Sequence, residues 1–581
     1  MSYLVTQPPV LETAAANVAE IQSVIAAANA AVAGRTTNVL AAAADEVSAA
    51  IAKLFAGYGE EYQAVVRQAT AFHQQFTQAL TSAGLAYAQT ELANALTTAS
   101  GAVAARATQA AAPLLQVMSD PATTWSIVLG ASGYPIPAPD YIDDLAALFI
   151  SPWRTIGSNL QGLNTPEGLY PLTGIKDLTL NDSVARGLTI LDNTIRPLLS
   201  DLQTVNILGY SQSSVISSLE MHLLNPANIP MPSLGDLSFT LLGNPANPNG
   251  GLLSRFPGLS LPSLGIDFGI ATPDNSFPTR IYTIEYDGFG GFPQYPINFL
   301  ADLNAFMGIL TLHGTYPLLT ADQVANAIQL TNTLGPVQTE YFMIPTAHLP
   351  LLDPVRAIPV IGNPIANLVE PDLRVLVNLG YGNTAHGWSP DPPNVATGFG
   401  VIPPVHPGDV VAALAAGSQQ GIAAFSADLA NNVLPAFANL PNTLPAAVNS
   451  ALQHAGTGGA AMLAGIQSSL SSPQSFIQSL LAANLKLAYT SSNIAATAYA
   501  AVLPTADVLN AAVTAIPAYD VYLFGNGLLQ AFNGDPVGGL INAFGGPVAA
   551  NVGLATLLAG FELRVIQHAA QSISSELSGL L

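Results

Sequence analysis

The pentapeptide Gly-Tyr-Ser-Gln-Ser at residues 209–213 places Ser211 between two small residues. The preceding residues 204–208 are β-rich and apolar, and residues 214–223 have the spacing of a helix packed on a sheet. At such a strand-to-helix turn a serine is exposed above the sheet, and small flanking residues keep the two backbones from colliding. We therefore predict that Ser211 is a nucleophile, although the usual motif ends in Gly rather than Ser213. The alternative is an ordinary turn with surface serines.

An acid and a base follow this serine along the chain. Asp287 comes directly after the strand-like residues 280–285, and the carboxyl ends of parallel strands are where such sheets place catalytic groups. His313 lies in a polar loop after a predicted helix at 297–307. In this hypothesis His313 accepts the proton of Ser211, and Asp287 holds the imidazole in the required tautomer. The alternative for Asp287 is a turn with the following glycine.

Two backbone N–H groups could receive the negative charge that develops on an attacked carbonyl. One belongs to Gln212, directly after the serine, and the other to Ala131 or Ser132 in the Gly-rich loop after the strand-like residues 125–129. The alternative for that loop is a simple tight turn.

Three other residues compete for the acid and base roles. His386 follows the strand-like residues 374–379, where many α/β hydrolases keep their base, and His348 follows another predicted strand. Asp302 is closer in sequence to His313, but it lies within a predicted helix and is expected to face solvent.

Composition excludes several other functions. The 581 residues carry 36 acidic and 14 basic groups, and this net charge of −22 disfavours nucleic acid and anionic membrane surfaces. The chain has no cysteine, which removes disulfides, thiolate catalysis and cysteine-bound metals. No nucleotide, flavin or metal motif is found, so we expect no cofactor and no metal.

The length suggests two or three domains, whose boundaries follow shifts in composition. Residues 1–100 are Ala-rich with one break at Gly34-Arg35, which predicts two long antiparallel helices that dock on a partner or pack on the rest of the chain. The segments that follow are a linker at 101–123, an α/β domain at 124–390, a Pro/Gly-rich linker at 391–408 and an Ala-rich helical region at 409–581. In this last region we expect helix breaks near Pro435, Pro445, Gly458, Pro504, Pro517 and Gly546.

Neither a signal peptide nor a membrane anchor is expected. No basic residue precedes Arg35, and the early apolar residues are spaced helically. No run reaches 18 uninterrupted apolar residues, and we interpret the longest candidate, at 545–563, as a buried helix.

The N-terminal segments MSYLVTQPP, AADEVSAAIAKLF, GEEYQAVVRQATAFHQQF and AYAQTELANA resemble the mycobacterial PE family over residues 1–97. The resemblance implies pairing with a PPE-family protein in a helical bundle and export by the type VII secretion machinery. The family's Tyr-x-x-x-Asp/Glu export signal maps onto Tyr87 and Glu91. One departure is Pro8-Pro9, where the family has Pro-Glu.

The segments GLYPLTG, GYSQS, GNPANPNGGLLSRF, YDGFGGFPQYP, LADLNA, HGTYP and VNLGYG resemble the PE-PPE domain over about residues 125–388. This resemblance implies a cutinase-like serine α/β hydrolase whose Ser, Asp and His map onto Ser211, Asp287 and His313. It also explains Ser213, since the family has serine there. Members are implied to be esterases on acyl chains, and some to be acyltransferases that build envelope glycolipids.

The predicted fold is an α-helical hairpin, then a cutinase-like α/β-hydrolase with a mostly parallel sheet, then a helical C-terminal region. The predicted function is a serine ester hydrolase acting on acyl esters or lipids, secreted or at the cell envelope and surface by type VII secretion. An acyltransferase with the same triad is the alternative. A second alternative is a non-catalytic secreted interaction protein, consistent with the Ala-rich helices and low charge.

Overall fold

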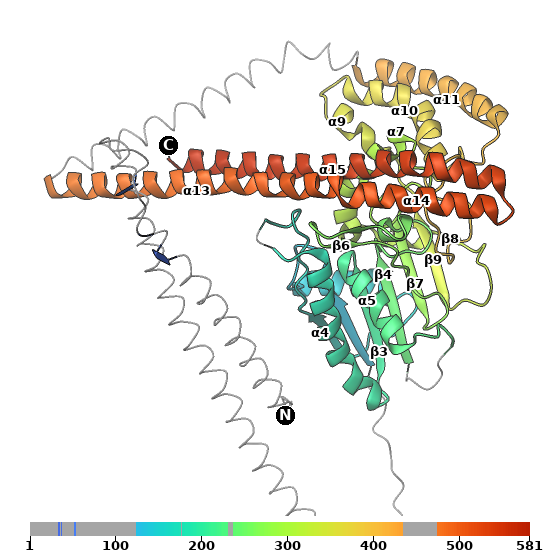
Figure 1. Cartoon of the computed structure of the whole chain (residues 1–581), viewed down its shortest axis with the longest axis horizontal. Coiled ribbons are helices and arrows are strands. Elements are labelled where there is room, and N and C mark those ends of the chain that lie inside the picture. Colours follow the sequence, from blue (N-terminus) through green and yellow to red (C-terminus); the bar gives the residue numbers. More distant parts are fainter. Residues whose placement is uncertain are drawn as a thin grey trace, which may run out of the picture. The chain divides into compact units, whose positions relative to one another are not determined.

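A computed structural model of the chain describes residues 33–34, 37, 52–53, 124–175, 177–230, 236–433 and 473–580. The chain divides into two compact units, residues 1–118 and residues 119–581. Apart from residues 33–34, 37 and 52–53, the predicted N-terminal hairpin lies outside the described residues. The pair Tyr87 and Glu91 and the predicted linker at 101–123 lie outside them as well. The second unit, which contains all the labelled elements of Figure 1, is described below.

The second unit is built around a seven-stranded, mostly parallel sheet in the order β2-β1-β3-β4-β7-β9-β8. Only the pair β8 and β9 is antiparallel within it. The strands are β1 Thr124–Leu129, β2 Asn159–Leu163, β3 Thr204–Tyr210, β4 Asp236–Leu242, β7 Thr279–Ile284, β8 Ile328–Leu330 and β9 Thr339–Ile344. Since the parallel strands point the same way, their carboxyl ends meet at one edge of the sheet.

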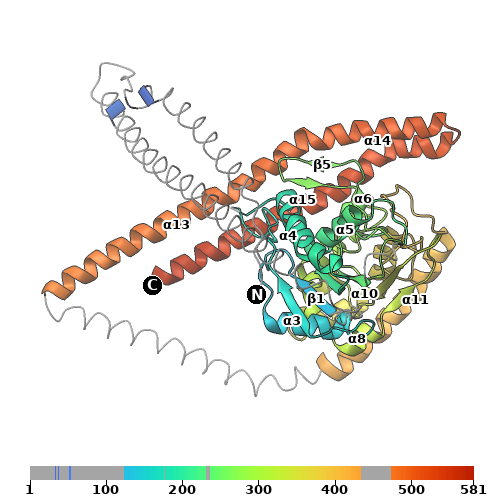
Figure 2. The same cartoon turned by 90° about the horizontal axis from the view of Figure 1, so that it is seen from below.

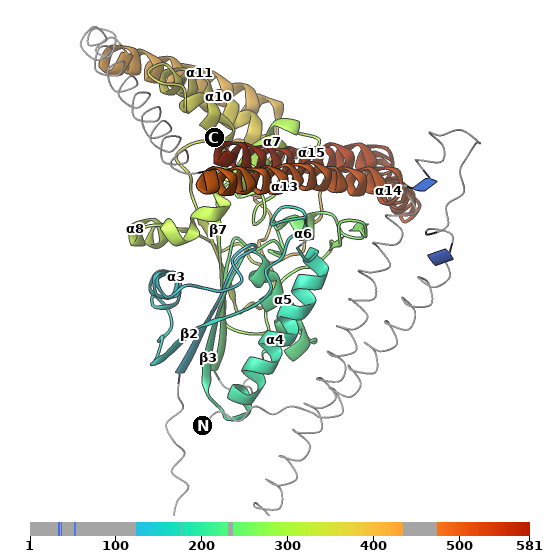
Figure 3. The ribbon, with the colours of Figure 1, turned by 90° about the vertical axis from the view of Figure 1, so that its left-hand side faces the viewer.

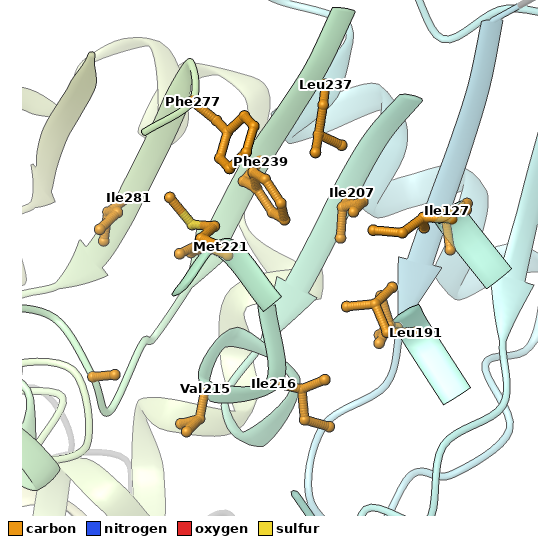
Figure 4. Close-up of a cluster of buried hydrophobic side chains, with 14 of the residues drawn as sticks. Ile127, Leu191, Ile207, Val215, Ile216, Met221, Leu237, Phe239, Phe277 and Ile281 are labelled. Carbon is orange, nitrogen blue, oxygen red and sulfur yellow. The ribbon is translucent and has the colours of Figure 1, made fainter. Parts of the chain in front are cut away.

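Helices cover both faces of this sheet, as Figure 3 shows. The helices α4 Leu180–Ser200 and α5 Gln212–Leu224 lie on one face, and α3 Pro139–Leu145 and the π-helical turn η1 Ala146–Ile150 on the other. Successive strand residues therefore enter different cores: Ile207 packs towards α5 (Figure 4), whereas Leu208 packs towards η1. Burial on both sides explains why these strands are almost continuously apolar. This architecture agrees with the predicted α/β-hydrolase.

Further helices and one short hairpin follow β4 along the chain up to residue 433. They are α6 Leu252–Arg255, the hairpin β5 Ser260–Leu261 and β6 Ile266–Asp267, α7 Phe299–Thr311, η2 His313–Leu318, α8 Ala321–Ala325, η3 Pro350–Leu352, α9 Asp353–Arg356, α10 Gly362–Asn378, η4 Leu379–Tyr381, α11 Pro407–Asp428 and η5 Leu429–Val433. The strand predicted at 374–379 is wrong, because these residues end α10 and form η4. A short apolar run does not distinguish a strand from a buried helical turn.

The predicted linker at 391–408 lies against the α/β domain. Asn249 Nδ2 donates to the carbonyls of Asp391 and Pro392, each at 3.2 Å. The buried Arg255 donates through Nη1 to Thr397 O at 2.9 Å. These hydrogen bonds fix the segment that leads into α11.

The C-terminal region is helical, as predicted, but its helices are longer than expected. They are α13 Pro473–Val513, α14 Ala515–Phe532 and α15 Pro536–Leu580. In Figures 1 and 2, α14 continues the line of α13, and α15 runs back alongside both. The breaks expected at Pro504 and Gly546 are wrong, because α13 and α15 continue through them. An internal proline costs about 3 kcal/mol, and here helix–helix packing offsets that cost. The expected breaks at Pro435, Pro445 and Gly458 lie outside the described residues.

Glycines let α15 approach the α/β domain closely. A Cβ on Gly560 would lie 2.4 Å from Phe306 Cε2 in α7, and one on Gly553 would lie 2.8 Å from Pro296 Cβ. The stretch 545–563, predicted as a buried helix, forms this part of α15, where Leu554 and Leu558 are buried. The C-terminal helices therefore belong to the same packed unit as the sheet.

By length and composition, three helical stretches of the described ranges are apolar enough to cross a membrane. They are Pro407–Asn432, Ala488–Phe532 and Pro536–Ser578, and half of the apolar window in the third is buried within the protein. Isolated polar residues interrupt each stretch, so none of them contains 18 uninterrupted apolar residues. The third stretch includes residues 545–563, which were predicted to form a buried helix.

Asp302 does not face solvent as predicted. It is fully buried in α7, where both carboxyl oxygens lack a hydrogen-bond partner in the described structure. Burial raises the pKa of Asp302 to about 9, because the charged form loses its hydration. Asp302 is therefore neutral at physiological pH and cannot supply a carboxylate to His313.

We predict that Asp302→Asn stabilises the fold, and more at pH 8 than at pH 5. The folded-state pKa of about 9 exceeds the ordinary 3.8, so wild-type stability falls as pH rises between these values. The variant should lose this dependence, which is at most about 1.4 kcal/mol per pH unit. Urea unfolding of the wild type and the variant at several pH values from 5 to 8 measures this dependence of the free energy of unfolding.

Asp143→Asn, at an exposed position on α3, is the control and should follow the wild-type curve. An unchanged pH dependence in Asp302→Asn would show that the carboxyl is charged in the folded state.

Candidate active site

Ser211 lies at a strained turn between β3 and α5. Its backbone has φ 59° and ψ −117°, a conformation that costs a non-glycine residue about 1–3 kcal/mol. The strain persists because the surroundings fix it: Ser211 N–H donates to Leu242 O at 2.9 Å. A Cβ on Gly209 would lie 2.6 Å from Ser213 O, so the turn requires glycine there. The structure thus has the strand, turn and helix that the sequence predicts around Ser211.

Ser213 ties this turn to the loop after β1. Its hydroxyl donates to Gly130 O at 2.6 Å and accepts from Tyr210 N–H at 2.8 Å. Glycine could make neither contact. The departure from the usual motif therefore positions the loop that contains Ser132.

The structure brings Ser211, His313 and Asp287 together. Ser211 Oγ lies 2.7 Å from His313 Nε2, and His313 Nδ1 lies 2.9 Å from both carboxyl oxygens of Asp287. A carboxylate only accepts hydrogen bonds, so Nδ1 carries the hydrogen and Nε2 presents its lone pair to the serine hydroxyl. Asp287 is fully buried and His313 nearly so. This arrangement can transfer the serine proton to the imidazole.

Two further donors hold the Asp287 carboxylate. Tyr316 OH donates to Oδ2 at 2.9 Å, and Phe289 N–H donates to Oδ1 at 3.1 Å. Burial, and then the charge of Asp287, raises the pKa of Tyr316 well above its ordinary value, so the phenol stays protonated and donates. These contacts compensate for the buried charge.

A second tyrosine positions the histidine. Tyr210 OH donates to the backbone carbonyl of His313, and burial raises the pKa of Tyr210 well above its ordinary value. The ring of Phe289 meets the imidazole edge-on, with ring centres 4.7 Å apart. Sequence reasoning missed Tyr210 and Tyr316, although both lie within the short segments that contain Ser211 and His313.

Gly243, at the end of β4, leaves room for these side chains. It has φ 50°, and a Cβ there would lie 3.0 Å from Asp287 Oδ2, 3.0 Å from His313 Cε1 and 2.9 Å from the Tyr316 ring. Any side chain at this position would displace them. Gly243 begins the segment GNPANPNGG, but nothing in this sequence pattern indicates that it lies against Asp287 and His313.

The two predicted oxyanion donors lie beside the serine. Gln212 is the first residue of α5, so its N–H has no acceptor within the helix and lies at the positive end of the helix dipole. The Gln212 side chain accepts from Ser183 Oγ at 2.7 Å, donates to Gly168 O at 2.7 Å and donates to Ser132 Oγ at 3.3 Å. Ser132 lines the same hollows as Ser211.

The competing histidines lie elsewhere. His386 stacks on Trp388 with ring centres 4.0 Å apart, and its Nδ1 lies 2.9 Å from the Trp388 carbonyl. Burial lowers the pKa of His386. His348 contacts Glu370 through Nδ1 at 3.2 Å. The structure does not bring either of them to Ser211.

Two hollows meet at Ser211. One is narrow and almost wholly apolar, and the other is wider and includes His313, Arg564 and His568. Within the described part of the chain, no three His, Cys, Asp or Glu side chains are placed to hold a metal ion.

Comparison with known proteins identifies two families in the chain. The PE family matches residues 4–94, and the PE-PPE domain matches residues 156–382. The PPE family protein PPE28 of Mycobacterium tuberculosis is 47% identical over 79% of this chain and 68% of its own length. From the same organism, the PE family protein PE3 is 43% identical over 77% of this chain and 92% of its own length. The esterase PE16, also of Mycobacterium tuberculosis, is 37% identical over 68% of this chain and 72% of its own length.

Weaker similarity extends to two acyltransferases of Mycobacterium tuberculosis. The SL1278 acyltransferase Chp1 is 31% identical over 37% of this chain and 52% of its own length. The diacyltrehalose acyltransferase Chp2 is 27% identical over 48% of this chain and 76% of its own length.

We predict that Gly243→Ala slows the reaction of Ser211 with a fluorophosphonate by about 100-fold. The added methyl would displace Asp287 and His313, and a shift of about 1 Å in such a group can cost that factor. Labelling rates measured on the full chain by gel fluorescence give the comparison.

Gly314→Ala is the matched control, because a Cβ there meets no atom within 4 Å although it is adjacent to His313. Equal labelling of the two variants would refute the steric argument.

Proposed function

The chain belongs to the PE family and carries a PE-PPE domain, as the sequence resemblance predicted, and we propose that this domain is a serine ester hydrolase acting on acyl esters or lipids. The observation that carries the proposal is the continuous chain of hydrogen bonds from Ser211 through His313 to Asp287. Similarity to an esterase and to acyltransferases supports activity on acyl groups.

In the first half of the reaction, Ser211 Oγ attacks the acyl carbonyl while His313 Nε2 takes its proton. The N–H groups of Gln212 and the Ser132 loop receive the oxyanion, an interaction of about 3 kcal/mol per donor. The ester C–O bond then breaks, and the alcohol leaves with the proton that the imidazolium returns. Asp287 stabilises that imidazolium, and an acyl-serine remains.

The second half decides between hydrolysis and transfer. Water, deprotonated by His313, attacks the acyl-serine and releases a fatty acid in the hydrolase. In the alternative, the hydroxyl of a glycolipid precursor attacks at the same carbon and carries the acyl group away. The chain is more similar in sequence to the esterase PE16 than to Chp1 or Chp2, and the similarity to PE16 extends over more of the chain. We therefore favour hydrolysis and keep envelope acyl transfer as the second candidate.

A non-catalytic interaction protein is the weakest of the three predicted functions. A scaffold would have no use for the strained backbone of Ser211 or for the buried carboxylate that faces His313. Strain at a hydrogen-bonded serine is typical of a reactive site.

We further propose that the N-terminal PE region pairs with a PPE-family protein and that the type VII secretion machinery carries the chain to the envelope or beyond. The PE match at 4–94 supports the pairing, and similarity to PPE28 and PE3 is compatible with it. Tyr87 and Glu91 are the proposed export signal.

We predict that Ser211→Ala abolishes hydrolysis of p-nitrophenyl esters, with kcat falling at least 1,000-fold, because no nucleophile remains. Fluorophosphonate labelling of the purified full chain should vanish with it. The matched control is Ser218→Ala, which removes a buried, hydrogen-bonded hydroxyl two turns further along α5. This variant should retain both ester hydrolysis and fluorophosphonate labelling.

Adding a monoacylated sugar separates the two candidates. Free fatty acid as the main product supports the hydrolase, and a doubly acylated sugar supports the acyltransferase. Wild-type chain that neither reacts with the probe nor turns over an ester in either assay would exclude both.

For export, Tyr87→Ala and Glu91→Ala should each retain the protein within the cell. Gln89→Ala, between them, is the control and should be exported normally. Immunoblots of cell and culture fractions measure the distribution. Normal export of both motif variants would refute this signal.

A further inference from the structure

The apolar hollow at Ser211 is enclosed from two directions. On one side it is lined by side chains of the α/β domain, including Val215, Leu252 and Leu264. On the other it is lined by Val508 of α13 and by residues of α15. The PE-PPE match ends at residue 382, so this second wall lies wholly outside the matched domain.

One face of α15 forms most of that wall. Leu554, Leu557, Leu558 and Phe561 follow the i, i+3, i+4, i+7 spacing of a single helical face, and all four line the hollow. The three leucines are at most 7% exposed. Leu563, on the same helix, is 64% exposed and does not line it. This face of α15 therefore lies towards Ser211, whereas Leu563 lies on another face of the helix.

Polar contacts hold the wall in place. Tyr170 OH donates to Asp507 Oδ2 at 2.5 Å, and Ser263 Oγ donates to the Asp507 carbonyl at 2.9 Å. Thr505 of α13 donates to Glu562 of α15. These bonds link α13 both to α15 and to two loops of the α/β domain. The wall is a fixed part of the site.

The hollow has the chemistry of a site for a hydrocarbon chain. Almost no polar surface is exposed within it, and it ends at the serine that attacks the acyl carbonyl. The other hollow at Ser211 contains His313, Arg564, His568 and Tyr134, which suit a polar alcohol or acceptor. An ester bound across Ser211 would thus place its acyl chain against α15 and its alcohol towards Arg564.

On the premise of the proposed acyl chemistry, we propose that the apolar hollow binds the fatty acyl chain of the substrate and that Leu554, Leu557 and Leu558 of α15 set the chain length accepted. Each methylene that finds room there favours binding by about fourfold. Leu557 lines the apolar hollow and not the other one, so a larger side chain there takes up space that a long acyl chain needs. It should remove this gain for long chains more than for short ones.

The test compares chain-length profiles of full-length variants on p-nitrophenyl esters from C4 to C16. Leu557→Trp should lower kcat/KM for C12–C16 at least 10-fold relative to C4, and Leu557→Ala should favour the longest chains. Leu563→Trp adds the same indole on the exposed face and should reproduce the wild-type profile. A Leu557→Trp profile parallel to wild type would overturn the proposal.

A binding assay separates this inference from the proposed catalysis. Dansyl-undecanoic acid should bind Ser211→Ala and bind the double variant Ser211→Ala/Leu557→Trp at least 10-fold more weakly. If the wild-type chain has no esterase activity, that binding result would refute the hydrolase and support the acyl site. An active wild-type enzyme whose chain-length profile is unchanged by Leu557→Trp, together with equal binding of dansyl-undecanoic acid by the two Ser211→Ala chains, would support the hydrolase and refute the acyl site.

If Leu557→Trp fails to fold by circular dichroism, Leu557→Ala and Leu554→Ala carry the test. Both enlarge the hollow. A chain-length preference unchanged in both would overturn the proposal.

Discussion

The parallel pairing of β3, β4 and β7 determines the geometry of the site. Tyr210 pairs with Leu242, and Leu242 with Tyr282, so these strands reach the same edge in register. Backbone hydrogen bonds continue past the strand ends, from Ser211 N–H to Leu242 O and from Gly243 N–H to Tyr282 O. Ser211, Gly243 and Asp287 thus converge because the sheet brings their strands to one edge.

Hydrogen bonds decide which buried carboxyl groups can be charged. Asp287 accepts from His313, Tyr316 and Phe289, which replace the water it has lost. Among the described residues, neither carboxyl oxygen of Asp302 or Glu220 has a hydrogen-bond partner. Burial raises the pKa of Asp302 to about 9, and burial followed by the nearby Asp192 raises the pKa of Glu220 to about 8. The protein therefore surrounds the buried Asp287 carboxyl group with hydrogen-bond donors, whereas Asp302 and Glu220 are buried as neutral acids.

Local sequence was sufficient for the parts of the site that depend on local geometry. The turn at Ser211 and the place of Asp287 after β7 follow from strand, turn and helix signals that span a few residues. The burial of Asp302, the helix at 374–378 and the continuation of α13 through Pro504 depend on which elements pack around them. The spacing of apolar residues within those segments does not indicate which elements pack around them.

The role of the C-terminal helices was out of reach for the same reason. Their composition is compatible with packing, covering an acyl channel or contacting lipid, and the structure shows α13 and α15 packed on the α/β domain, where they line the hollow at Ser211. Since the proton-transfer groups come from the sheet edge and one wall of the hollow from α13 and α15, the two can vary independently. A change in the face of α15 could alter the accepted acyl chain while Ser211, His313 and Asp287 keep their geometry. Such a division would allow one sheet edge to serve esterases and acyltransferases with different substrates.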